Sequence, residues 1–167
     1  MEARFLKTEL EKHLPGSEIF LDSDDLKDLR SLLAYVRDSS ALVVVQSAEI
    51  LYRPWCLLEM YAAIESGVPI VALLCQGKGY DFGQATQFLT NLDSQLEQKT
   101  PGAGKTIYDE GVDIRDLAFK LAHVIPNLIS VSFNPSGSKN TIEASIRDLM
   151  EAMVTATPVE LPDNKAE

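Results

Sequence analysis

One carboxylate, Glu59, stands alone inside the long apolar run "RPWCLLEMYAAIESGVPIVALL". Pro54 suits the first turn of a helix and Gly67 suits its C-terminal end, which predicts a helix over roughly 54–66. Apolar side chains cover nearly the whole circumference of that helix, and Trp55 lies one turn before Glu59 on the same side. An ionised carboxylate in such a helix has to be paired, hydrogen-bonded or lining a cleft. An exposed or structurally paired glutamate is the plainer interpretation, and spacing alone leaves both open.

Alternating apolar segments predict the elements that position this helix. Continuous β-branched runs at 41–45 ("ALVVV") and 69–74 ("PIVALL") are typical of strands covered on both faces, and further strands are expected at 18–22 and 128–133. Periodicity predicts the other helices around 5–14, 26–36, 83–98, 113–123 and 140–153, with a loop from Lys99 to about Gly111. Strands that alternate with helices predict a parallel sheet. Clefts in such sheets form beyond the carboxyl ends of the strands, where the helix at 54–66 begins.

Length, charge and cysteine content narrow the class of protein. A chain of 167 residues makes about one domain, which we expect over 1–156 with a disordered tail at 157–167. The net charge of −10 argues against binding to nucleic acid or to an anionic membrane surface. With two cysteines, no cleavable signal pattern and no apolar run of spanning length, the sequence is typical of a soluble, cytoplasmic protein. Small molecules and protein partners remain as ligands.

Three other patterns suggest chemistry and are set aside. The segment 99–106, "KTPGAGKT", resembles a phosphate-binding loop, but Lys99 stands at the first Gly position, a helix precedes it, and no helix is expected directly after it. The segment "DSDDLKDLRSLL" lacks the sixth-position Gly and the final Glu of a calcium loop. The two histidines and two cysteines are too isolated for metal-ligand spacing, so no metal site is expected.

The segment from Ile19 to Leu73 closely resembles the Toll/interleukin receptor (TIR) domain. The resemblance rests on an ordered set: a strand ending in Asp, an acidic loop, a helix, the strand "ALVVV" followed by Ser47, then W-C-L-L-E and G-V-P-I-V. It covers about a third of the chain well and the remainder only in layout. It implies a flavodoxin-like fold, in which a parallel sheet of strand order 2-1-3-4-5 carries helices on both faces.

The same resemblance implies a function. TIR domains are signalling modules of innate immunity that act by homotypic self-association, and many hydrolyse NAD to nicotinamide and ADP-ribose or a cyclic product. By similarity Glu59 is the catalytic residue, NAD is a substrate rather than a cofactor, and the chain forms homo-oligomers with other TIR domains as partners. The implied substrate-binding residues are Trp55, Ser47, Asp22, Ser23 and Asp24. The alternative is a non-catalytic interaction module that works by homotypic assembly.

The chemistry gives this resemblance a physical reason. Breaking the bond between nicotinamide and ribose builds positive charge on the ribose, so a carboxylate in a dry cleft stabilises the transition state more than the ground state. Glu59 can also hold a ribose hydroxyl. Trp55 can stack on a flat ring or serve as a core aromatic, and Ser47 can bond the ligand or cap a turn. The acidic loop at 22–28 can gate the site or be a solvated helix start.

One departure from the family pattern bears on activity. Family members open with a strand before their first helix, and here residue 1 already enters that helix, so we expect this strand to be missing. It would lie between the strands at 18–22 and 41–45, and both edges there are expected to be unpaired. Its outgoing loop borders the ligand cleft in the family. The W-C-L-L-E segment therefore favours an enzyme, whereas the missing strand favours the interaction module.

Overall fold

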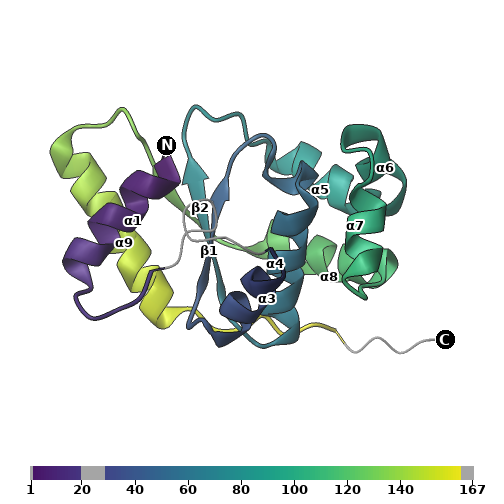
Figure 1. Ribbon diagram of the computed structural model, residues 1–167. Helices are drawn as coiled ribbons and strands as arrows, with labels where there is room; N and C mark the ends of the chain where they lie inside the picture. The colour runs from purple at the N-terminus through teal and green to yellow at the C-terminus, as the bar shows by residue number, and fades with distance from the viewer. Residues whose placement is uncertain (1, 20–28, 163–167) are drawn as a thin grey trace.

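A parallel sheet between two layers of helices forms the centre of the computed structural model, which describes residues 2–19 and 29–162 (Figure 1). Within that part of the chain the sheet has the order β1-β2-β3, and both neighbouring pairs are parallel. The strands are β1 (Leu42–Gln46), β2 (Ile70–Cys75) and β3 (Ser130–Phe133). The predicted α/β, flavodoxin-like class with helices on both faces is therefore confirmed.

The helices divide between the two faces of the sheet (Figure 1). One face is covered by α1 (Glu2–His13) and α9 (Lys139–Thr155). The other side holds α3 (Leu29–Asp38), the 3-10 turn η1 (Ile50–Tyr52), α4 (Pro54–Glu65), α5 (Phe82–Thr90), α6 (Leu92–Lys99), α7 (Ala103–Asp109), α8 (Ile114–Val124) and the 3-10 turn η2 (Ile125–Asn127).

Each face of the sheet has its own core. The smaller core cluster joins the sheet to α1 and α9 through Leu6, Leu10, Val71, Leu73, Cys75, Phe133, Ile146 and Leu149. The larger core cluster lies on the opposite face and includes Leu33, Val44, Leu57, Ile70, Leu89, Leu117 and Leu121. Ile70 of β2 enters the larger core cluster and Val71, Leu73 and Cys75 enter the smaller one, so both faces of this strand need apolar residues, which explains its continuous apolar sequence.

The single helix predicted near 83–98 is wrong, because the chain forms α5 and α6 with a break at Asn91. Asn91 leaves helical geometry (φ −114°, ψ 26°), and its side-chain amide donates to the carbonyl of Gln87 at 2.9 Å. The break redirects the chain so that Leu92 and Leu96 are fully buried in the larger core cluster. Asn competes well for backbone groups in this way, which makes it a common helix end.

The loop predicted from Lys99 to about Gly111 is also wrong, because it contains the short helix α7. Ala103 and Ile107, four residues apart, are both buried and hold one side of this helix against the larger core cluster. Two apolar residues are too few to give a recognisable helical period. A helix therefore begins inside the "KTPGAGKT" segment, at Ala103, where the sequence predicted none.

The predicted strand at 18–22 falls mostly on residues outside the described part of the chain. Glu18 and Ile19 are described, and neither belongs to a strand. Among the described residues β1 pairs only with β2. At the other end of the chain, residues 157–162 have no regular structure, yet Leu161 packs against the larger core cluster. None of the helices placed by the structure is long and apolar enough to cross a membrane.

Candidate functional site

The junction between β1 and α4 holds three of the predicted site residues. Ser47 directly follows β1, is half-buried, and accepts a backbone hydrogen bond from Ile50 at 3.3 Å as the chain turns into η1. Trp55 and Glu59 follow on α4, one turn apart and therefore on the same side of the helix. The other predicted contacts, Asp22, Ser23 and Asp24, lie outside the described residues.

Helix α4 is held firmly by its neighbours, since it packs against α3, α7, α8 and β2. Its buried residues are Leu57, Leu58, Met60, Ala62 and Ala63. Glu59 lies between two of these in sequence and is itself half-buried. Trp55 is half-buried and packs against the larger core cluster, so its role as a core aromatic is observed, and stacking on a ligand stays a prediction. The helix thus holds a carboxylate at a fixed place close to the apolar core.

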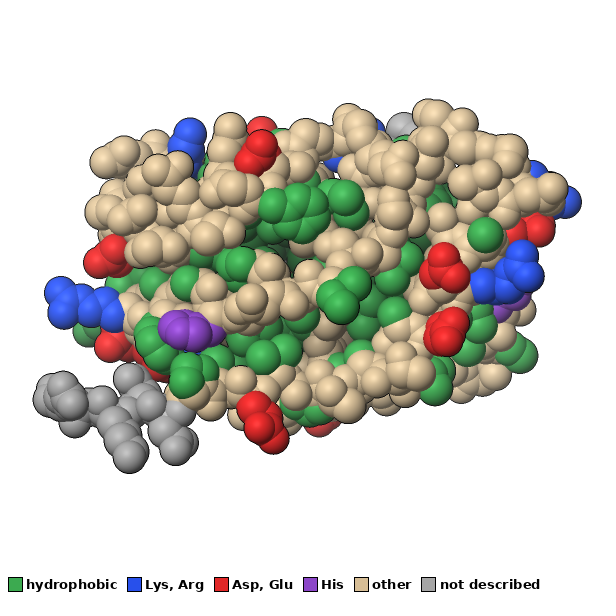
Figure 2. Space-filling view, turned by 180° about the vertical axis from the view of Figure 1, so that it is seen from behind, with side chains coloured by type: hydrophobic (Ala, Val, Ile, Leu, Met, Phe, Trp, Pro, Cys, Tyr) green, Lys and Arg blue, Asp and Glu red, His purple; other side chains and the backbone are tan. Residues whose placement is uncertain are grey.

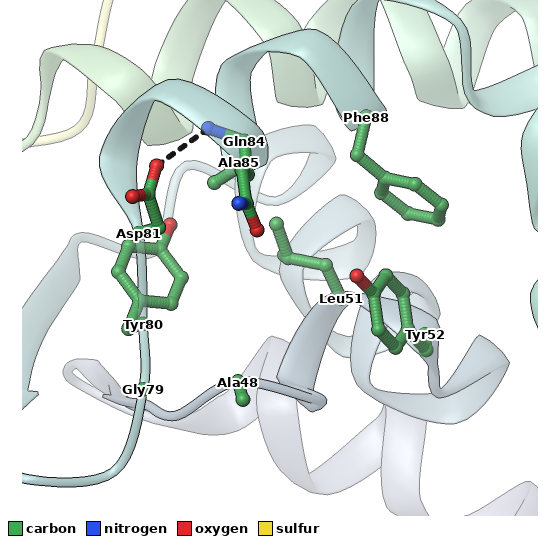
Figure 3. Close-up of a pocket in the computed structure, with 9 residues that line it drawn as sticks. All are labelled: Ala48, Leu51, Tyr52, Gly79, Tyr80, Asp81, Gln84, Ala85 and Phe88. Carbon is green, nitrogen blue, oxygen red and sulfur yellow. Dashed lines mark hydrogen bonds between the residues drawn. The ribbon is translucent and has the colours of Figure 1, made fainter.

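A small hollow lies nearby, at the carboxyl ends of β1 and β2 (Figure 3). Its volume is about 30 Å³, which is room for one or two water molecules. The lining residues are Ala48, Leu51, Tyr52, Gly79, Tyr80, Asp81, Gln84, Ala85 and Phe88. Figure 3 shows that the Asp81 carboxylate turns to the start of α5, where it accepts from the backbone N–H of Gln84 at 2.8 Å. Neither Glu59 nor Trp55 lines this hollow.

A series of hydrogen-bonded polar side chains, centred on a buried residue, lies beside the hollow and was not predicted from the sequence. Gln46, at the end of β1, is only 2% exposed, and its side-chain oxygen accepts from the Ser130 hydroxyl on β3 at 2.6 Å. Gln46 also hydrogen-bonds Tyr80, in the loop between β2 and α5. Burial raises the pKa of Tyr80, while the bond to Gln46 works in the opposite direction. The one sign of these hydrogen bonds in the sequence was that a polar residue, Gln46, ends an otherwise apolar strand.

The C-terminal half of α4 is joined to α8 by four polar side chains, Tyr61, Glu65, Asp116 and Lys120, which we call the α4–α8 polar cluster. The Tyr61 hydroxyl donates to Asp116 at 2.6 Å, and Lys120 donates to Asp116 at 2.9 Å and also to Glu65. The Lys120 ammonium lies 5.3 Å from the centre of the Tyr61 ring, within the range of a cation–π contact. The cluster is a structural bridge between two helices.

These contacts perturb the proton affinities of the cluster. Burial, followed by the hydrogen bond to Asp116, raises the pKa of Tyr61 to about 12. The hydrogen bonds from Tyr61 and Lys120 lower the pKa of Asp116. Burial opposes the charge of Lys120, but its hydrogen bonds to Glu65 and Asp116 outweigh that effect and raise the pKa of its ammonium. The folded state therefore favours a protonated Tyr61 and an ionised Lys120–carboxylate group.

In the segment that resembles a phosphate-binding loop, two backbone N–H groups are already hydrogen-bonded to a carboxylate of the protein. Glu97, near the end of α6, accepts from the backbone N–H groups of Gly102 at 3.0 Å and Gly104 at 2.7 Å. These are N–H groups at the start of α7, where a bound phosphate would otherwise accept. Over the described ranges, 2–19 and 29–162, no group of three or more His, Cys, Asp or Glu residues could hold a metal ion.

Comparison with known proteins adds no family assignment. No model of a protein family matches this chain, and no curated protein matches it. The candidate site is consequently defined by its own residues, Glu59, Trp55 and Ser47, at the junction of β1 and α4.

Proposed function

We propose that this chain is a TIR-domain signalling protein of the cytoplasm, acting in innate immunity, that hydrolyses NAD to nicotinamide and ADP-ribose or a cyclic form. The observation that supports it most is the placement of Glu59. This half-buried carboxylate stands among the buried apolar residues of α4, a helix that follows the carboxyl end of β1. That edge of a parallel sheet is where ligand clefts form.

In this proposal Glu59 acts on the ribose. The bond between the ribose C1 and the nicotinamide nitrogen breaks, its electron pair goes to the nicotinamide ring, and the ring loses its positive charge. The positive charge that appears on the ribose is stabilised by the Glu59 carboxylate, and water or a second group of the substrate then adds to C1. Because Glu59 is half-buried, this attraction is screened less than it would be in open water.

The other predicted residues take supporting roles in the proposal. Trp55, one turn before Glu59, offers a ring edge or face to the substrate, and Ser47 offers a hydroxyl at the end of β1. Asp22, Ser23 and Asp24 belong to the loop proposed to close over the ligand. NAD is the substrate, and no cofactor is required.

The test compares two glutamates on one helix. Nicotinamide release from NAD is measured by chromatography for the native chain, for Glu59→Gln, and for the matched control Glu65→Gln, whose side chain is exposed and pairs with Lys120. We expect Glu59→Gln to lose at least about 100-fold in turnover, as when a transition-state charge partner is removed. Glu65→Gln should keep its turnover. A folded Glu59→Gln variant with unchanged nicotinamide release would contradict the proposal.

The second candidate is a non-catalytic module that signals by homotypic assembly with other TIR domains. The lining of the hollow in Figure 3 favours it, because this hollow at the carboxyl ends of β1 and β2 includes neither Glu59 nor Trp55. In that case the folded native chain should release no nicotinamide, and Glu59→Gln should change nothing in the assay. Concentration-dependent sedimentation of both proteins would then support the assembly role.

A further inference from the structure

Residues 157–162, which follow α9, form an extended segment that we call the strap. Figure 1 shows it in yellow, leaving the end of α9 and running toward the helices on the other side of the sheet. Ala156, just before the strap, packs against the smaller core cluster, and Leu161 packs against the larger one. The strap therefore passes from one core of the protein to the other.

Two prolines favour the extended form of the strap. A proline fixes its own φ at about −65° and disfavours helical geometry in the residue before it. Pro158 and Pro162 therefore bias Thr157 and Leu161 toward extended backbone, and α9 cannot continue past them. Ala156, the last residue before the strap, is already extended (φ −61°, ψ 140°). A segment that is extended beforehand loses less conformational freedom when it docks.

The strap covers an apolar groove between the ends of α4 and α8. Pro158 and Val159 of the strap close over this groove. The groove itself is lined by Ala63, Ile64, Val68, Ile70 and Val124. A gap of about 10 Å³ remains beneath the strap, at the lower limit for one water molecule. Because every lining residue is apolar, the groove suits an apolar segment and offers nothing to a charged ligand.

The strap is held more weakly than the elements that it joins. Within the described ranges, 2–19 and 29–162, no backbone hydrogen bond links residues 157–162 to another segment. Val159 is 42% exposed, and Leu161 is half-buried while the other residues of the strap are exposed. Segments with few buried apolar contacts and exposed backbone open at a far lower free energy than the core does. The strap can therefore leave its groove while the helices stay folded.

The strap distinguishes this groove from the other apolar surface of the molecule. Figure 2 shows apolar side chains in the middle of the rear face, with charged ones toward its rim. No described segment is seated on those side chains, so they do not indicate a ligand. The groove under the strap does, because the segment seated on it carries a proline, a β-branched residue and, two residues later, a leucine.

We propose that the strap is a releasable intramolecular ligand of this groove, and that an extended, proline-containing apolar segment of a partner protein displaces it. Proline-containing segments bind grooves in this way because their extended form exists before binding. The groove reaches Ile70, the first residue of β2, and so lies at the amino end of that strand. The proposal does not depend on Glu59 or on cleavage of NAD.

Binding of a labelled synthetic peptide, TPVELP, tests the groove. Fluorescence anisotropy measures its affinity for the full chain. Leu161→Glu puts a charge on the most buried residue of the strap, so this variant should bind the peptide at least about tenfold more tightly than the native chain, whose own strap competes. The control Val154→Glu makes the same apolar-to-acidic change at a residue of α9 that is 82% exposed, and should bind like the native chain.

NMR tests whether the strap opens by itself. In Leu161→Glu the methyl resonances of Ile64 and Val124 should shift, and they should return toward their native positions when the peptide is added. The amides of α4 and α9 should stay protected from hydrogen exchange throughout. The proposal is overturned if Leu161→Glu binds the peptide no more tightly than the native chain does. It is equally overturned if Leu161→Glu loses the protection of α4, because the strap would then be a fixed part of the core.

Discussion

The two halves of α4 hold their carboxylates in different ways. Glu65, at the end of the helix, is exposed and bonded to Lys120, and through it to Asp116 and Tyr61 on a bridge to α8. Glu59, about 1.7 turns earlier, is half-buried, and its neighbours in the sequence are the core residues Leu58 and Met60. The difference shows that one described set of polar contacts to α8 comes from the second half of the helix, through Tyr61 and Glu65.

Removing a buried apolar side chain from α4 should have the largest effect on the free energy of unfolding. Leu58→Ala deletes a side chain that is 1% exposed in the larger core cluster, and should lower the free energy of unfolding by about 3 kcal/mol. Urea denaturation measures this. Val154→Ala removes a comparable apolar side chain from an exposed position and should change stability by less than about 0.5 kcal/mol. Equal effects at the two positions would mean that α4 is not a core helix.

Breaking only the α4–α8 polar cluster should have a smaller effect on the free energy of unfolding. Lys120→Met leaves Asp116 and Glu65 without their cation, and because Lys120 is only 19% exposed we expect a loss of about 1 kcal/mol. The matched control is Lys105→Met, which breaks the exposed pair with Asp109 and should cost close to nothing. Both are read from urea midpoints. If Lys120→Met is as harmless as its control, the α4–α8 polar cluster does not anchor the helix.

The smallest effect on stability should come from changing the protonation of the α4–α8 polar cluster with pH. The folded-state pKa of Tyr61 is about 12, above its usual value of about 10, so its contribution to stability is present below pH 10 and is lost as the pH rises toward 12. The raised pKa of Lys120 acts in the same direction. Unfolding midpoints at pH 9 and pH 11 should therefore differ less in Tyr61→Phe than in the native chain. An identical pH dependence in both would remove Tyr61 from the cluster's energetics.

The elements around Glu59 could be predicted because their signals are local. Pro54 and the residues before Gly67 marked α4 to within one residue, and the β-branched runs marked β1 and β2 to within one residue. The α4–α8 polar cluster could not be predicted, because Tyr61 and Asp116 are 55 residues apart and show no pattern. The buried bond from Ser130 to Gln46 spans 84 residues and was hidden for the same reason. Tertiary contacts of single polar residues leave almost no trace in a sequence.

The Glu97 carboxylate at the start of α7 has a consequence for nucleotide binding. It is tethered five residues from Gly102, so it competes with any free anion as an intramolecular ligand at a high effective concentration. A phosphate would have to displace this carboxylate and then stay beside its negative charge. An acidic residue shortly before a glycine-rich "GAGKT" string can therefore distinguish a self-capped helix from a true phosphate loop in other sequences that carry the same letters.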